Sequence, residues 1–136
     1  MSDIISILKG QEFFYSKSGV SVDEIQRAED NLSLKFAAEY MQYLATFGAV
    51  SADMHEFTGL GVSPRLDVVA VTTKERQKNP NIPHDLYVIE QLHIDDIVIW
   101  QSLNGNIYQV IGVSEPVKIH DSFSMYINAC FRPIES

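Results

Sequence analysis

The chain has 136 residues and a formal net charge of −8, from 18 acidic and 10 basic side chains. This charge argues against DNA or RNA binding, which needs a basic face, and favours a basic protein partner. The alternative is that the negative charge serves only to keep the protein soluble. With 46% hydrophobic and 21% charged residues, the composition is that of a globular chain and excludes disorder.

Three further features predict a cytoplasmic protein that does not contact a membrane. No apolar run approaches the roughly 20 residues that span a bilayer. The first residues lack the basic leader of a secretory signal and carry Asp3 within their apolar stretch. Cys130 is the one cysteine, which excludes an internal disulfide and is typical of a reducing compartment.

A short helix and an aromatic segment open the chain. Apolar residues predict a helix over residues 4–9, which ends at Gly10. Residues 13–15 are three consecutive aromatic side chains. We expect them to pack on the edge of the core rather than to form a binding patch.

Two adjacent helices are the best-marked elements of the sequence. Ser21 and Glu24 have the spacing of a capping box, which predicts a helix over residues 22–31. The apolar side chains of this helix recur at three- and four-residue spacing and are predicted to be buried: Val22, Ile25, Ala28 and Leu32. A hydrophobic elbow leads to a second helix over residues 37–47, and Gly48 suits its end because glycine adopts positive φ easily.

The middle of the chain has weaker patterns. Residues 54–60 show no helical period and predict an extended passage followed by a turn. Residues 67–79 are ambiguous, because β-branched side chains open the segment while charged helix formers close it. Asp67 is a good N-cap and the Asn-Pro pair at the end is a good stop, so we predict a helix here.

Strands and a last helix follow. The predicted strands cover residues 86–92, 97–100, 107–111 and 117–119. Asn104 and Gly105 predict a tight hairpin turn in which both residues have positive φ. A helix is predicted over residues 122–132, with Asp121 or Ser122 as its cap. The whole pattern predicts an α+β fold, a single domain over residues 1–136, with a small, mostly antiparallel sheet and helices packed around it.

The helix pair also resembles a known family. The spacing of its apolar, acidic and aromatic residues resembles the signature of the SUKH superfamily at the following positions: Ile25, Glu29, Leu32, Leu34, Phe36, Glu39, Tyr40, Tyr43, Leu44, Phe47 and Gly48. That superfamily joins fungal regulators of cell-wall synthesis to bacterial immunity proteins of polymorphic toxin systems. The resemblance implies a binding protein without a catalytic motif, and it also implies a helix at residues 67–79.

Over its full length the sequence is similar to immunity members that are paired with toxins of the LXG class. This similarity implies a protein that occludes the active site of a basic toxin encoded beside it, with a nuclease expected and an RNase preferred to a DNase. The alternative is an intracellular regulatory adaptor of the fungal type that inhibits no toxin. Exposed apolar edges would favour a homodimer, which no sequence feature decides.

A search for catalytic or metal-binding patterns finds little. There is no His-x-x-x-His or Cys-x-x-Cys spacing and no Gly-x-Ser-x-Gly elbow, so we expect no enzyme, no metal site and no cofactor. His93 and Asp95 would share a face on a strand, which leaves a hydrolase built on them as a third hypothesis. Cys130 lies on the apolar stripe of the last helix and is expected to be a buried, inert thiol.

Acidic residues away from the helix surfaces are the candidates for binding a basic partner, because carboxylates pair with Lys and Arg. These candidates are Asp53, Glu56, Glu90, Asp95 and Asp96. Trp100 is a candidate anchor because interface hot spots favour Trp. The alternative for Trp100 is a core position in a central strand.

Overall fold

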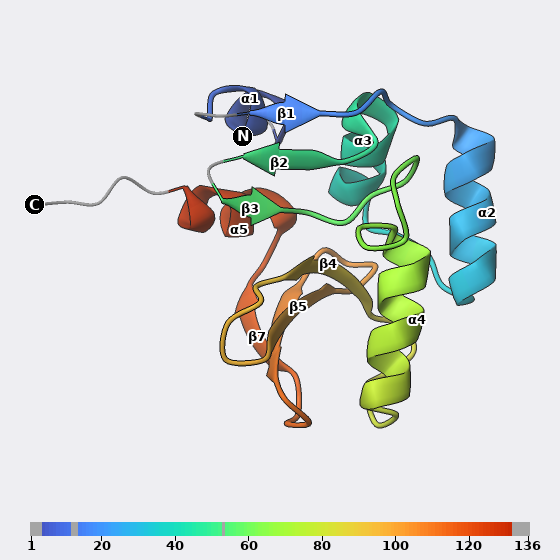
Figure 1. The fold of residues 1–136 in the computed structure, drawn as a ribbon, viewed down its shortest axis with the longest axis vertical. Helices are drawn as coiled ribbons and strands as arrows, with labels where there is room; N and C mark the ends of the chain where they lie inside the picture. The colour runs from blue at the N-terminus through green and yellow to red at the C-terminus, as the bar shows by residue number, and fades with distance from the viewer. Residues whose placement is uncertain (1–3, 12–13, 53, 132–136) are drawn as a thin grey trace, which may run out of the picture.

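The computed structural model describes residues 4–11, 14–52 and 54–131. Within this part of the chain the helices are α1 (Ile4–Lys9), α2 (Val22–Leu32), α3 (Ala38–Phe47), α4 (Val68–Lys78) and α5 (Phe123–Cys130). The strands are β1 (Tyr15–Ser16), β2 (Val50–Ala52), β3 (His55–Glu56), β4 (Tyr87–Gln91), β5 (Ile97–Gln101), β6 (Ile107–Ile111) and β7 (Val117–His120). Figure 1 shows their arrangement, which confirms the α+β prediction.

The strands form two antiparallel sheets rather than the one that the sequence predicted. Three short strands are ordered β1-β2-β3, and four longer strands are ordered β4-β5-β6-β7. The chain after β3 joins the two sheets: Phe57 pairs with Glu90, and the Thr58 N–H donates to the Ile89 carbonyl at 2.9 Å. The passage that was predicted to be extended therefore connects the sheets and places β3 beside the edge of β4.

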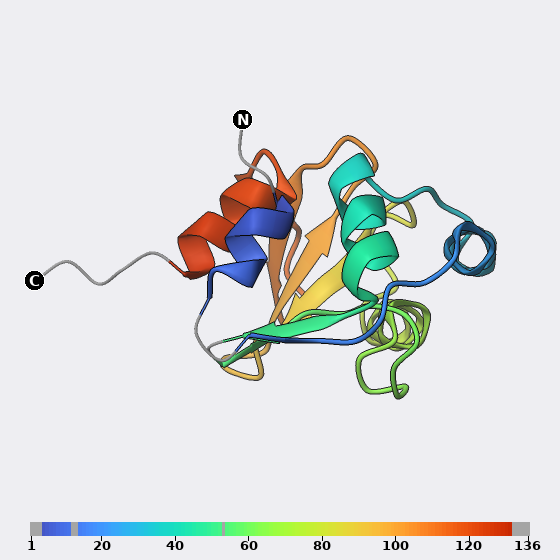
Figure 2. The ribbon, with the colours of Figure 1, turned by 90° about the horizontal axis from the view of Figure 1, so that it is seen from above.

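Helices cover both faces of the four-stranded sheet. The larger hydrophobic cluster gathers apolar side chains of α1, α2, α3 and α5 over one face, including Tyr40, Phe123, Ile89 and Ile99. The smaller cluster lies under α4 on the other face, with Val71, Val88, Trp100 and Val110 among its members. Figure 2 shows α1 and α5 side by side, with strands of the four-stranded sheet between this pair and α4.

A buried tyrosine ties α3 to the chain around the smaller sheet. The Tyr43 hydroxyl accepts a hydrogen bond from the Val50 N–H at 2.9 Å and donates to the Thr58 carbonyl at 2.8 Å. Tyr40 bonds the Thr58 hydroxyl at 2.8 Å from the same helix. Because these polar groups are buried and mutually satisfied, they fix the segment that carries β2 and β3 against the core.

The helix starts follow the local capping signals. The Glu24 N–H donates to Ser21 Oγ at 3.2 Å, and the Met125 N–H donates to Ser122 Oγ at 3.1 Å. Asp67 Oδ1 accepts from the first-turn N–H groups of α4 at 2.9 and 3.0 Å, which resolves the ambiguous segment as a helix. Side-chain oxygens that accept from the free N–H groups of a first turn favour a helix start at these points.

The buried face of α2 differs from the prediction at its first residue. Val22 is 73% exposed, so the buried stripe begins at Ile25. Glu29, by contrast, is buried, and its Oε2 accepts from the Phe36 N–H at 2.9 Å. This bond holds the elbow between α2 and α3, which is why a carboxylate occupies a position that hydrophobic periodicity alone does not identify.

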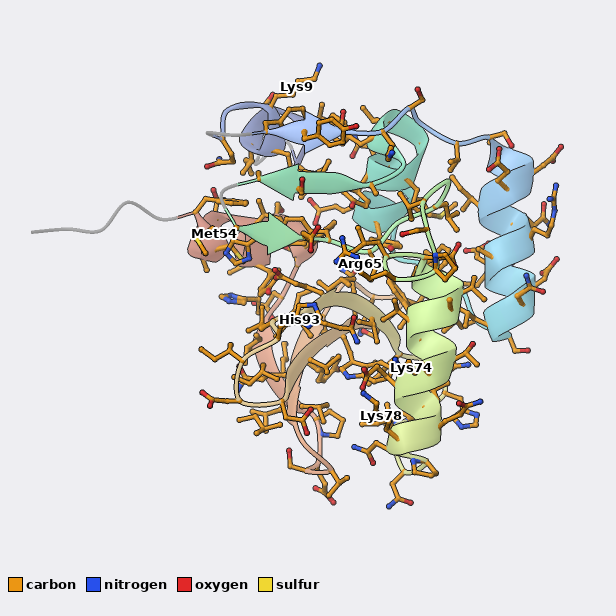
Figure 3. All side chains as sticks on the ribbon, viewed as in Figure 1. Lys9, Met54, Arg65, Lys74, Lys78 and His93 are labelled. Carbon is orange, nitrogen blue, oxygen red and sulfur yellow. The ribbon has the colours of Figure 1, made fainter. Side chains whose placement is uncertain are left out.

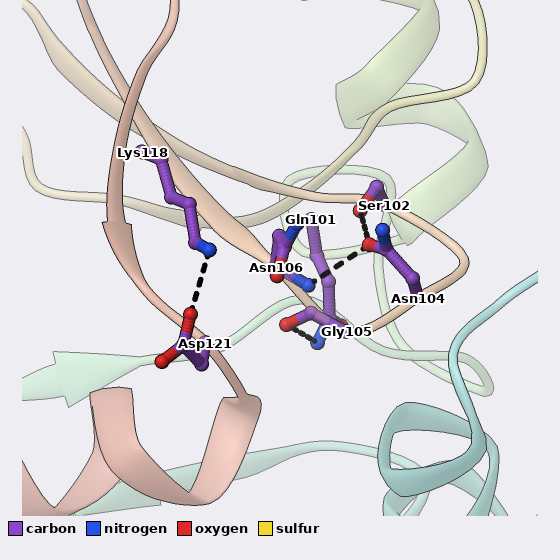
Figure 4. A network of polar contacts seen from close by, with 7 residues as sticks. All are labelled: Gln101, Ser102, Asn104, Gly105, Asn106, Lys118 and Asp121. Carbon is purple, nitrogen blue, oxygen red and sulfur yellow. Dashed lines mark hydrogen bonds and ion pairs between the residues drawn. The ribbon is translucent and has the colours of Figure 1, made fainter.

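The hairpin turn between β5 and β6 is longer than predicted. The Ser102 N–H donates to the Asn106 carbonyl at 3.1 Å, so Leu103, Asn104 and Gly105 form the connection. Gly105 has a φ of 94°, and Asn104 is not among the described residues with positive φ. Figure 4 shows the Asn104 side chain bonded to Ser102 and Asn106, which stabilises the turn without a second positive φ.

Candidate functional site

A hollow of about 250 Å³ lies between the turn that joins β2 to β3 and the loop that joins β4 to β5. We call residues 92–96 the β4–β5 loop. The residues that line the hollow are Met54, His55, Glu56, Glu90, Gln91, Leu92, His93 and Ile94. Figure 3 shows the labelled Met54 and His93 on the side of the molecule that faces the viewer. The fold thus brings together two segments that are far apart in the sequence.

The backbone around the hollow is held in an unusual conformation. The non-glycine residues with positive φ in the described chain are Ser33, Met54, His93, Asp95 and Asp96, and all but Ser33 belong to these two segments. The Leu92 N–H donates to the Ile97 carbonyl at 3.1 Å, and the Gly112 N–H donates to the Asp96 carbonyl at 3.0 Å, so both ends of the loop are fixed. Such conformations cluster at functional sites, where the need for a particular side chain outweighs the conformational energy that positive φ costs the backbone.

The segments beside the hollow expose apolar and acidic side chains, and the acidic ones follow the lining residues in the β4–β5 loop. We call Met54, His93, Ile94, Asp95 and Asp96 the rim. Met54 is fully exposed and Ile94 is 60% exposed. Asp95 and Asp96 are exposed as well, and neither carboxylate has a hydrogen bond or an ion pair to another residue in the described ranges. The rim therefore offers unpaired negative charge beside accessible apolar surface.

Glu56 lies at the side of the hollow, where a neighbouring cation already pairs it. Arg65 Nη1 and Nη2 donate to the two carboxylate oxygens of Glu56 at 2.8 and 2.9 Å. Hydrogen bonding by Arg65 is the main cause that lowers the pKa of the Glu56 carboxyl. Glu56 lines the hollow together with His93, and Arg65 already pairs with both of its carboxylate oxygens.

A β-bulge in β4 determines where Glu90 points. Val88 pairs with Trp100 and Glu90 pairs with Ile99, so Ile89 is the extra residue. Regular alternation would place Glu90 on the face of Val88, under α4. The bulge turns Glu90 to the opposite face instead, where its carboxylate meets His55.

Glu90 is the centre of a polar group beneath the hollow, which we call the buried cluster: His55, Glu90, Tyr126 and Cys130. His55 Nδ1 lies 2.6 Å from Glu90 Oε2, and the Tyr126 hydroxyl donates to Glu90 Oε1. One ring nitrogen of His55, one carboxylate oxygen of Glu90 and Cys130 Sγ all lie within 4.8 Å of one another. Tyr126 and Cys130 reach this point together because residues four apart share one face of a helix.

The electrostatics of the buried cluster favour a protonated imidazole and a neutral phenol. Interactions with the Cys130 side chain and then with Glu90 raise the pKa of His55 to about 10, against the opposing effect of burial. Burial and the neighbouring Glu90 charge raise the pKa of Tyr126, so its hydroxyl remains a donor. Both groups stabilise the Glu90 carboxylate, which explains how an acidic side chain that is 2% exposed is tolerated.

The structure places the predicted partner-binding residues in different environments. Asp95 and Asp96 are exposed residues of the rim that follow the lining residues His93 and Ile94 in the chain, and Glu56 lines the hollow itself. Glu90 and Trp100 are buried, so their side chains are not accessible to a partner. Trp100 is a core residue of β5, which is the alternative that the sequence analysis gave for it. Asp53 lies outside the described residues, as does Phe13 of the aromatic segment.

Two other predictions change with the geometry. His93 and Asp95 lie in a loop with positive φ rather than on a strand, so the alternation that would have aligned them does not apply. Cys130 does pack against the larger hydrophobic cluster, as its position on the helix stripe predicted. However, Cys130 is only partly buried and lies beside an imidazole and a carboxylate.

Sequence analysis did not connect His55 with Glu90 or Cys130, and it did not identify Tyr126 as a member of a site. The four-residue spacing of Tyr126 and Cys130 was readable, and it shows that the two share a helix face. Nothing local shows that this face meets β3 and β4, because the meeting depends on how α5 packs across the sheets and on the bulge at Ile89.

Comparison with known proteins gives the family. The SUKH_5 family, described as SMI1-KNR4 cell-wall, matches residues 1–131, so this chain belongs to that family of the SUKH superfamily. Members of the superfamily are generally non-enzymatic immunity or regulatory proteins, and a protein partner is implied. No curated protein matches the chain. Among the described residues, no helix has the length and hydrophobicity to cross a membrane.

Proposed function

We propose that this protein is an immunity protein that binds a co-encoded toxin of the LXG class and occludes its active site. In this proposal the toxin is a nuclease, and an RNase is preferred to a DNase. The observation that carries the proposal is the rim, which presents unpaired carboxylates and apolar side chains from a backbone with positive φ. Family membership supports a protein partner, and toxins are among the partners that the family implies.

The charge of the rim suits a nuclease. A nuclease needs a basic cleft for its polyanionic substrate. Asp95 and Asp96 can pair with the Lys and Arg side chains of such a cleft without first breaking an ion pair within the described chain. Met54 and Ile94 supply apolar contact beside these charges, and the net charge of −8 accelerates the encounter with a basic protein.

Two other hollows suit a basic partner less well. A hollow of about 290 Å³ is lined by Lys17 and Arg65 and is therefore partly basic. A hollow of about 520 Å³ carries Asp85 and Glu115, but none of its lining residues is a non-glycine residue with positive φ. This last hollow provides a matched control, because its two exposed acids carry the same charge as Asp95 and Asp96.

The test is co-expression of this protein with the toxin encoded beside it, scored by cell survival and by pull-down of a complex. We expect rescue and a stable complex. The double substitution Asp95→Asn with Asp96→Asn should then lower the association rate at low salt by about tenfold. The control Asp85→Asn with Glu115→Gln removes the same net charge and should lower this rate much less.

Each outcome decides something. Absence of both rescue and complex contradicts immunity and favours the regulatory adaptor of cell-wall synthesis that the family description also covers. Rescue with equal effects of the two double variants keeps immunity but contradicts binding at the rim. A complex that forms without rescue contradicts occlusion of the active site.

A further inference from the structure

The buried cluster brings together three kinds of metal ligand from three separate elements. His55 comes from β3, Glu90 from β4 and Cys130 from the end of α5. Their imidazole nitrogen, carboxylate oxygen and sulfur lie within 4.8 Å of one another. Zinc binds these ligand types in proteins, and a site with three protein ligands leaves a further position open. Hard cations such as Mg²⁺ and Ca²⁺ prefer oxygen ligands alone, so a thiol and an imidazole argue against them.

The ligand side chains are held in place by neighbours that do not themselves bind. The Tyr126 hydroxyl donates to Glu90 Oε1, which leaves Oε2 directed at His55 Nδ1. The His55 ring is nearly parallel to the Phe57 ring, at 6°, and meets the edge of the Phe131 ring with centroids 5.2 Å apart. Such second-layer contacts orient the ligands of metal sites and reduce the entropy lost on binding.

An ion can reach the buried cluster through the hollow. His55 and Glu90 both line the hollow of about 250 Å³, and the His55 side chain is 25% exposed. Glu90 is almost fully enclosed. The hollow therefore connects solvent to His55 and Glu90, where water can complete the coordination of a bound ion, and Cys130 reaches them from α5.

We propose that His55, Glu90 and Cys130 bind one Zn²⁺ ion, with water from the hollow as the remaining ligand. Binding replaces the proton between His55 and Glu90 and the proton of the Cys130 thiol, and both protons pass to solvent. Affinity therefore rises with pH, as expected where a metal competes with protons for its ligands. The proposal concerns the floor of the hollow, so it stands or falls independently of toxin binding at the rim.

The first experiment uses the full chain after treatment with a chelator. Zn²⁺ is titrated against a chromogenic chelator, and Co²⁺ is added in a parallel experiment as a spectroscopic probe. We expect saturation at one ion per chain and, with Co²⁺, a near-ultraviolet band from thiolate-to-cobalt charge transfer. This band reports a bond to sulfur, which a cluster that is only hydrogen-bonded cannot give.

Variants then locate the ion. Cys130→Ser should abolish the charge-transfer band, and Tyr126→Phe, which removes only the donor to Glu90, should weaken Zn²⁺ binding about 10–100-fold. His84→Gln is the matched control, because His84 is an exposed histidine elsewhere on the chain and should leave binding unchanged. Circular dichroism without metal checks that each variant folds, and Tyr126→Phe retains the aromatic ring if Cys130→Ser does not fold.

Three results would overturn the proposal. These are the absence of saturable Zn²⁺ binding by the folded wild-type chain, a Co²⁺ complex without the charge-transfer band, and binding that Tyr126→Phe leaves unchanged while His84→Gln weakens it. The last result would place the ion on surface histidines. In each case the buried cluster would be a hydrogen-bonded network only.

Discussion

The two loops at the ends of β5 make the same kind of connection with different residues. Both join antiparallel neighbours in one sheet. The loop between β5 and β6 uses Gly105 where the backbone needs positive φ, whereas the β4–β5 loop uses His93, Asp95 and Asp96. Glycine enters this region without a Cβ clash, while an ordinary side chain there costs about 1–2 kcal/mol and Asp somewhat less.

The two loops also differ in how their side chains are bonded. The loop between β5 and β6 is stabilised internally through Asn104, which bonds Ser102 and Asn106 (Figure 4). The carboxylates of Asp95 and Asp96 have no such partner among the described residues. Backbone hydrogen bonds hold this loop, but its exposed carboxylates add no stabilising contact of their own, which supports the proposal that they serve a partner.

The largest effect is expected from removing the core residue in the strand that both loops share. Trp100→Ala should lower the free energy of unfolding by about 3–5 kcal/mol, because it empties the centre of the smaller hydrophobic cluster. Urea unfolding measures this loss. Trp100→Phe should be much milder, since the indole N–H makes no hydrogen bond within the described chain. Equal losses for the two substitutions would contradict a purely packing role.

The second largest effect tests the role of glycine in the loop between β5 and β6. Gly105→Ala should destabilise the protein by about 1–2 kcal/mol, because alanine is strained at a φ of 94°. The added Cβ would lie 3.5 Å from the Asp121 carbonyl oxygen, an ordinary contact, so the effect isolates the backbone. Thermal and urea unfolding give the value, and an unchanged midpoint would show that the loop relaxes to another turn.

The opposite substitution, of a non-glycine residue by glycine in the β4–β5 loop, should stabilise the protein. His93→Gly removes the Cβ strain at a φ of 58° and should raise the free energy of unfolding by up to about 1 kcal/mol, less the added entropy of glycine in the unfolded chain. Urea unfolding against wild type is the measurement. A destabilised His93→Gly protein would mean that the imidazole supports the hollow more than its conformation costs.

The smallest effect concerns the exposed ion pair beside the loop between β5 and β6. Lys118 Nζ lies 2.6 Å from Asp121 Oδ1, and this hydrogen bond lowers the pKa of Asp121. The pair therefore contributes stability above the ordinary aspartate pKa of about 4, and this contribution is lost as the pH falls through the lower folded value. Asp121→Asn should reduce the acid dependence of the unfolding midpoint, measured between pH 5 and pH 2 by circular dichroism. An unchanged acid profile would show that solvent screens the pair completely.

Local rules predicted the elements that depend on neighbouring residues. Ser21, Asp67 and Ser122 cap the helices that the sequence predicted for them, and the strands from β4 to β7 lie where β-branched residues gather. Each of these signals acts within a few residues, so one sequence contains all the information needed.

The site was less predictable because it depends on departures from those rules. Asp95 and Asp96 were identified as exposed acids, but their positive φ could not be read from residue types. Glu90 was expected on the surface and is buried, because hydrophobic clusters cover both faces of its strand, and the bulge at Ile89 turns it toward His55. The meeting of His55 with Cys130 depends on packing between distant elements, which no local pattern encodes.

The separation of the buried cluster along the chain has a consequence for the order of folding. β4, β5, β6 and β7 pair in chain order through short loops, so this meander can form early. His55 is 35 residues from Glu90, and Glu90 is 36 residues from Tyr126, so their contacts close large loops and are expected late. The hollow therefore exists only in molecules that have completed folding, and a partner that binds there selects finished molecules from partly folded ones.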